Sequence, residues 1–106
     1  MSRIDAIRKI LESQPNDPFP RYGLAMELKN TQQRDAAFAE FVELERRFPD
    51  YVPQYLMHFN VLVELKKKDD ARALAERGLA SARRSGNNHA LGELQQAVDA
   101  LEDADD

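Results

Sequence analysis

The sequence predicts an all-α protein, and its composition carries that prediction. Ala, Leu, Met, Glu, Lys, Arg and Gln, which favour helices, supply 59 of the 106 residues, whereas Val, Ile and Thr, which favour strands, supply nine. Charged residues make up 32% and apolar residues 42% of the chain, a balance typical of globular proteins. A chain of this length has room for one ordinary domain, so we expect a single domain over residues 1–106.

The first three predicted helices are separated by prolines and by a polar break. Ser2 and Asp5 have nearly the spacing of a capping box, and apolar residues then recur at helical intervals. Three prolines between residues 15 and 20 predict a rigid connector outside any helix. These breaks bound three helices, over about residues 3–13, 21–29 and 35–48.

The last three predicted helices differ in how their apolar residues are arranged. The fourth is apolar almost all round, which predicts burial on several sides and a central place in the fold. Asp69 or Asp70 is expected to cap the fifth helix. The sixth helix has a one-sided apolar stripe and is followed by a short acidic tail at residues 103–106. The three helices are expected over about residues 53–65, 70–84 and 88–102.

The chain repeats its own pattern at an interval of 34 residues. A shift of 34 places Pro15 on Pro49, Leu28 on Leu62 and the Asp35–Ala39 segment on Asp69–Ala73. Such a period, with two helices in each unit, is typical of stacked helical hairpins. It predicts the following arrangement: a half repeat at 3–15, a first repeat at 18–51, a second repeat at 52–85 and a capping helix at 88–102.

The residues at the repeated positions resemble those of the tetratricopeptide repeat family. The first unit has Arg21, Leu24, Ala25, Leu28, Ala37, Phe41, Leu44 and Pro49 at the family's pattern positions. The second unit has Tyr55, His58, Phe59, Leu62, Ala71, Ala75, Gly78 and Arg83, and so departs from the pattern at the aromatic and terminal proline positions. The resemblance implies antiparallel hairpins stacked as a right-handed superhelix, and a non-catalytic role in binding other proteins.

The two units invert the sizes of one pair of side chains. Where the first unit has small Ala25 and large Leu44, the second has large Phe59 and Gly78. We therefore predict that Gly78 makes room for Phe59, and that a leucine at position 78 costs about 1–3 kcal/mol.

The resemblance also implies where a ligand would lie, on the first helix of each repeat. The expected site is an apolar groove with a polar rim. Its walls are Phe19, Tyr22, Met26, Leu56 and Val63, and its rim is Lys29, Asn60 and Lys67. Because neither Tyr22 nor Leu56 is the lysine that carboxylate-clamping members of the family carry, we expect an amphipathic helix or extended segment with apolar anchors instead. Two alternatives remain open: the groove joins two copies of the chain as a homodimer, or the last helix covers it and its side chains are ordinary core.

Few residues in the sequence could support chemistry. The chain has no cysteine, no glycine-rich phosphate loop and two histidines without metal-site spacing, so we expect no enzyme activity, metal or cofactor. The net charge of −4 argues against binding of nucleic acid or anionic membrane. Residues 66–84 carry a local charge of +4, which we expect the acidic segment after them to neutralise. With no leader-like or membrane-spanning stretch in the sequence, the expected compartment is the cytoplasm.

Overall fold

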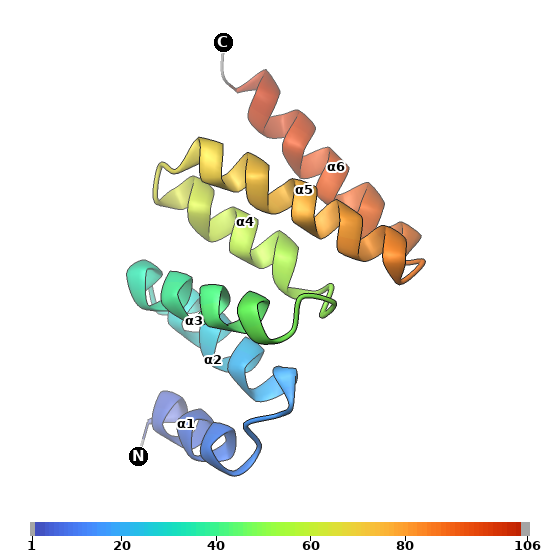
Figure 1. The fold of residues 1–106 in the computed structure, drawn as a ribbon. Helices are drawn as coiled ribbons and strands as arrows, with labels where there is room; N and C mark the ends of the chain where they lie inside the picture. The colour runs from blue at the N-terminus through green and yellow to red at the C-terminus, as the bar shows by residue number, and fades with distance from the viewer. Residues whose placement is uncertain (1, 105–106) are drawn as a thin grey trace. The chain divides into compact units, whose positions relative to one another are not determined.

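The protein is described here by a computed structural model covering residues 2–104, which form six helices (Figure 1). The helices are α1 (Arg3–Ser13), α2 (Pro18–Asn30), α3 (Arg34–Arg47), α4 (Gln54–Glu64), α5 (Lys68–Arg84) and α6 (Asn88–Asp103). Because residues 2–104 contain no strand, the all-α prediction is confirmed. The helices belong to two compact units, one ending at Pro49 and the next beginning at Asp50.

The ends of α1 and α6 test the predicted boundaries at the two ends of the chain. The capping box of α1 is present, because the Asp5 amide donates to Ser2 Oγ at 3.1 Å and the Ser2 amide donates to Asp5 Oδ2 at 3.4 Å. At the other end, Asp103 is the last residue of α6, so the predicted acidic tail begins inside a helix. Asp105 and Asp106 of that tail lie outside the described residues.

The second helix begins earlier than the prolines suggested. We predicted a rigid connector up to Pro20, but α2 starts at Pro18. The prediction was wrong because amides in the first turn of a helix have no partner within the helix, so proline removes no hydrogen bond there. The Asp17 side chain caps this turn by accepting a hydrogen bond from the Phe19 amide at 3.0 Å. Phe19 therefore belongs to α2 and shares its helical spacing.

The first unit has a small apolar core between α2 and α3. The residues buried there are Leu24, Ala25 and Leu28 from α2 and Ala37, Phe41 and Leu44 from α3, as the repeat pattern predicted. An ion pair joins the same two helices, with Arg21 Nη1 2.5 Å from Glu40 Oε1. The two side chains are only 16% and 20% exposed, so both have lost most of their contact with water. Shifted by 34 residues, the equivalent positions in the second unit hold Tyr55 and Leu74.

We expect the loss of one partner of this ion pair to destabilise the protein more than the replacement of both partners by apolar residues. Glu40→Leu alone would leave the Arg21 guanidinium shielded from water without its carboxylate, and should lower the free energy of unfolding by about 1–3 kcal/mol. Adding Arg21→Met fills the space with apolar atoms and should return stability to within about 1 kcal/mol of the wild type. Urea denaturation of the two single variants and the double variant measures the coupling. If the double variant lost as much free energy of unfolding as the two single variants together, the expected coupling between Arg21 and Glu40 would be contradicted.

The repeat is visible in the backbone where the first helix of each hairpin ends. Gln32 and Lys66, which are 34 residues apart, both have a φ of 64°, in the left-handed region. After α2, the Gln33 amide donates to Leu28 O at 2.8 Å; after α4, the Lys67 amide donates to Leu62 O at 2.9 Å. Both helices thus end in the same Schellman-type turn. The backbone therefore repeats at the same 34-residue interval as the sequence.

The second unit packs α5 against both α4 and α6 (Figure 1). The helices α4 and α6 are also in contact. Its α5 begins at Lys68 with Lys67 as a capping residue that makes no side-chain cap hydrogen bond. The prediction that Asp69 or Asp70 caps this helix was therefore wrong. Both lie inside the first turn, where a carboxylate still interacts favourably with the helix dipole.

The contact made at Gly78 differs from the one predicted. A Cβ atom added at Gly78 would lie 2.7 Å from Tyr55 Cβ, 2.9 Å from Tyr55 Cγ and 3.1 Å from Leu94 Cδ1. The three nearest atoms thus belong to Tyr55 and Leu94, whereas the prediction named Phe59, which is also buried. The glycine lets α5 approach α4 closely at Tyr55.

Candidate functional site

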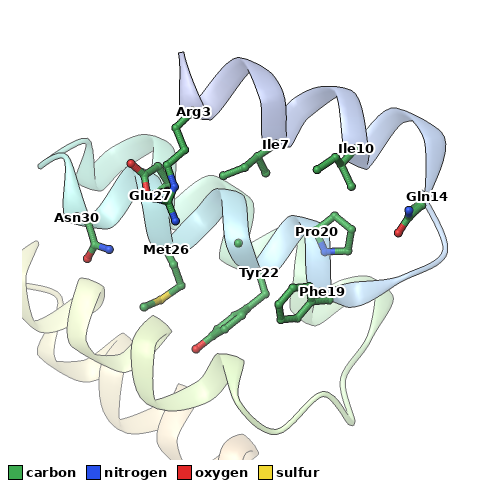
Figure 2. A pocket seen from close by; sticks show the side chains of 11 residues that line it. Arg3, Ile7, Ile10, Gln14, Phe19, Pro20, Tyr22, Met26, Glu27 and Asn30 are labelled. Carbon is green, nitrogen blue, oxygen red and sulfur yellow. Dashed lines mark ion pairs between the residues drawn. The ribbon is translucent and has the colours of Figure 1, made fainter. Parts of the chain in front are cut away.

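A pocket of about 410 Å³ opens between α1 and α2 in the first unit (Figure 2). Most of its lining is apolar or aromatic. The lining residues are Arg3, Ile7, Ile10 and Gln14 from α1 and its end, and Phe19, Pro20, Tyr22, Gly23, Met26, Glu27 and Asn30 from α2. Because a pocket of this size and character can accept apolar side chains, it is the candidate site of this unit.

The α2 wall of the pocket follows from helical spacing. Phe19, Tyr22 and Met26 are three and four residues apart and so lie on one face of α2. Phe19 is 67% exposed, which is unusual for a large aromatic side chain. Tyr22 is partly buried, and this burial raises the pKa of its phenol above the ordinary value, so the group stays neutral at physiological pH. These three side chains are therefore uncharged and largely apolar.

The α1 wall is formed by Ile7 and Ile10, which point from α1 toward α2 (Figure 2). No residue of α1 is fully buried, and Ile10 is 48% exposed. Within its unit α1 packs on α2 and on no other helix of the described chain. One helix cannot cover the whole apolar stripe of α1, so this side of the pocket is apolar and partly exposed to solvent.

Polar groups mark the two ends of the pocket. At one end, Arg3 Nε lies 3.2 Å from Glu27 Oε2, with Asn30 close by (Figure 2). At the other end is Gln14. Arg3 and Glu27 are the two charged residues of the lining, and they neutralise each other. The pocket thus has no net charge with which to attract an ionic ligand.

The structure brings three of the predicted groove residues into this pocket. Phe19, Tyr22 and Met26 line it, whereas Lys29, on the same helix, does not. The other four belong to the second unit: Leu56, Asn60 and Val63 are half-buried on α4, and Lys67 is the exposed capping residue of α5. A shared groove between the two sets stays a prediction.

Sequence reasoning missed the contribution of α1 and of Gly23. Ile7 and Ile10 are among the apolar residues that recur at helical intervals after Asp5, but they were not predicted to line a site. The signal that could have found them is their spacing, because Ile7 and Ile10 are three residues apart and so share one face of the predicted helix.

Two arginines of the basic segment of α5 form ion pairs with acidic residues of the second unit. Arg72 Nε lies 2.8 Å from Glu102 Oε1 of α6, which confirms the predicted pairing between the basic and acidic segments at this point. Arg84 instead pairs with Asp50, its Nη2 lying 2.6 Å from Asp50 Oδ1. Both pairs are substantially exposed and contribute little to stability. Their effect is to neutralise part of the basic surface.

The two histidines lie in different surroundings. His58 is buried on α4, as expected of a core histidine, and His89 Nε2 lies 3.3 Å from Glu93 Oε1 on the surface of α6. Residues 2–104 contain no group of three or more His, Cys, Asp or Glu side chains placed to hold a metal ion. Among the helices of residues 2–104, none combines the length and apolar character needed to cross a membrane.

Two of the solved structures that are similar to this chain come from one source organism. A crystal structure of a tetratricopeptide repeat domain protein from Salinibacter ruber is 37% identical, with a TM-score of 0.77, and the match covers 81% of this chain and 97% of that one. A solution NMR structure of a tetratricopeptide repeat domain protein from the same organism is 38% identical, with a TM-score of 0.78, over 83% of this chain and 89% of that one. Comparisons with protein-family models and with curated proteins gave no match.

Proposed function

Because the chain belongs to the tetratricopeptide repeat family, we propose that it is a non-catalytic module that binds a segment of another protein in the pocket between α1 and α2. The observation that carries this proposal is the exposure of Phe19 beside Ile10 at an apolar pocket. Large apolar side chains exposed together cost solvation free energy in the free protein, and an interface removes that cost. Aromatic residues and methionine, such as Phe19 and Met26, are also enriched at the centre of interfaces.

We further propose that the other predicted groove residues extend the binding surface along the repeats. Leu56 and Val63 would add apolar contacts, and Lys29, Asn60 and Lys67 would add polar ones. The bound segment would need no cofactor or metal. The cytoplasm remains the predicted compartment, and imaging of a fluorescently tagged chain in its source cell tests it.

The pocket is tested by selecting peptides from a displayed library of random 12-residue sequences. Peptides selected on the wild type should carry Leu, Phe or similar anchors, and Phe19→Ala or Met26→Ala should each weaken their binding about tenfold or more. Fluorescence anisotropy with labelled peptides gives the dissociation constants. Val42→Ala, which truncates another exposed apolar side chain outside the pocket, is the matched control and should leave them unchanged. A library that yields no peptide distinguishing the wild type from the two pocket variants would refute the pocket as the binding site.

A second candidate function is self-association through exposed apolar side chains. Ile10, Phe19 and Val42 are the large apolar residues most exposed to water in residues 2–104, and two copies could cover them by pairing. Light scattering across a concentration series separates the two functions. A dimer that Phe19→Ala dissociates would favour self-association, whereas a monomer at all concentrations would exclude it.

A further inference from the structure

Gly23 lies within α2, where glycine has no conformational purpose. The glycine with positive φ in the described chain is Gly86, so Gly23 is not required by its backbone geometry. Glycine inside a helix lowers stability relative to alanine, because it loses more conformational freedom on folding. What Gly23 provides in place of helix stability is the space that a side chain would otherwise fill.

Among residues 2–104, no neighbouring side chain or helix needs the space at Gly23. A Cβ atom added at Gly23 would have no atom of residues 2–104 within 4 Å, apart from its helical and chain neighbours. Gly78 is the opposite case, because there an added Cβ would meet Tyr55 and Leu94. Folding therefore explains Gly78 but leaves Gly23 unexplained.

Gly23 does lie on the wall of the pocket. It is four residues after Phe19 and three before Met26, so it occupies the middle of the α2 face that lines the site. With no side chain there, the helix backbone is bare between Phe19 and Met26. The missing side chain leaves a recess in the wall, which an incoming group could fill.

The charges of the pocket indicate what kind of group this is. Arg3 and Glu27 pair with each other at 3.2 Å, and the remaining lining residues are uncharged. A charged group entering the pocket would lose water and gain no counter-charge, which is unfavourable. An apolar group would replace water against Ile7, Phe19 and Met26, which is favourable.

We infer that Gly23 is a specificity-determining residue, which leaves space for one large apolar side chain, Leu or Phe, of a bound partner segment. This inference rests on the proposed function and names the anchor that the pocket selects. The anchor would lie against the bare backbone of α2, with Phe19 and Met26 on either side. Relative to alanine, Gly23 lowers helix stability but leaves that recess open.

The test compares Gly23→Ala with Gly92→Ala. Both glycines lie inside helices, and an added Cβ meets nothing within 4 Å in residues 2–104 at either site, but Gly92 is on α6 and does not line the pocket. Both variants should therefore melt about 2–6 °C above the wild type. Only Gly23→Ala should weaken the library-selected peptides, by about fivefold or more, and Gly23→Leu should weaken them further.

A chemical probe tests the anchor without the library. N-acetyl amides of Leu, Phe, Ala and Lys are titrated against ¹⁵N-labelled protein and followed by NMR. The Leu and Phe amides should shift the amide signals of Phe19, Gly23 and Met26 at concentrations where the Ala and Lys amides do not. Gly23→Leu should abolish these shifts, because its own side chain fills the recess.

The outcomes separate this inference from the proposed function. If Phe19→Ala weakens peptide binding while Gly23→Ala and Gly23→Leu do not, the pocket binds peptides but the recess has no role, and the inference is overturned. If Gly92→Ala weakens binding as much as Gly23→Ala, the effect is not local and the inference also fails. If the wild type self-associates and Gly23→Leu does not, the recess is filled by a second copy of the chain and not by a partner segment. That result also overturns the inference.

Discussion

The Gly78→Leu variant is expected to lose about 3 kcal/mol of unfolding free energy, the upper end of the usual range for overpacking a core. A Cβ atom at position 78 would approach Tyr55 Cβ at 2.7 Å and Tyr55 Cγ at 2.9 Å, both closer than carbon atoms tolerate. Tyr55 Cβ is bonded directly to the α4 backbone, so a change of rotamer cannot move it away. Relief requires α4 and α5 to separate, which weakens one of the helix contacts that hold the second unit together.

Two alanine variants, one at Gly78 and one at Gly92, serve as comparisons for Gly78→Leu. Gly78→Ala introduces the same Cβ without the rest of the leucine side chain, and the gain in helix preference of about 1 kcal/mol offsets part of the clash. We therefore expect the free energy of unfolding of Gly78→Ala to lie between those of the wild type and Gly78→Leu. Gly92→Ala makes the same change where an added Cβ meets nothing within 4 Å among the described residues, and should be at least as stable as the wild type. A urea midpoint for Gly78→Leu equal to that of the wild type would show that α4 and α5 can separate without loss.

The sequence was sufficient to place the helices because its signals there are local. Apolar spacing and the 34-residue shift fixed the hairpins, and the Schellman-type turns at Gln32 and Lys66 repeat at the same interval. The start of α2 was missed because proline has opposite effects at different helical positions. It disrupts a helix interior but is well tolerated in the first turn, as at Pro18 and Pro20.

Contacts between helices could not be predicted with the same accuracy. Tyr55 and Phe59 are one helical turn apart, so both lie on the face of α4 that turns toward its partner. Which of them meets Gly78 depends on how far α4 slides along α5, and no local pattern in the sequence encodes that distance. The same limit applies to the pocket. The apolar residues of α1 and α2 were visible in the sequence, but the space left between the two helices depends on their packing.

The Phe41→Ala variant is expected to lose about 3–5 kcal/mol of unfolding free energy. Phe41 is completely buried on α3, and within residues 2–49 it is the one aromatic side chain that is fully buried. The unit that contains it has fewer than 50 residues, and α1 adds no fully buried residue to its core. Small cores have little stability in reserve, so the cavity left by the phenyl ring would remove a large share of it.

Two further variants show whether the loss comes from the cavity. Phe41→Leu keeps most of the volume and should cost about 1–1.5 kcal/mol. Val42→Ala truncates the neighbouring residue, which is 46% exposed, and should change stability by less than about 0.5 kcal/mol. Urea denaturation gives the three free energies, and amide hydrogen exchange locates the effect, which should be a loss of protection in α2 and α3. Equal losses in Phe41→Ala and Val42→Ala would mean that α3 does not bury Phe41 against α2, and the repeat-like core assigned to the first unit would then be wrong.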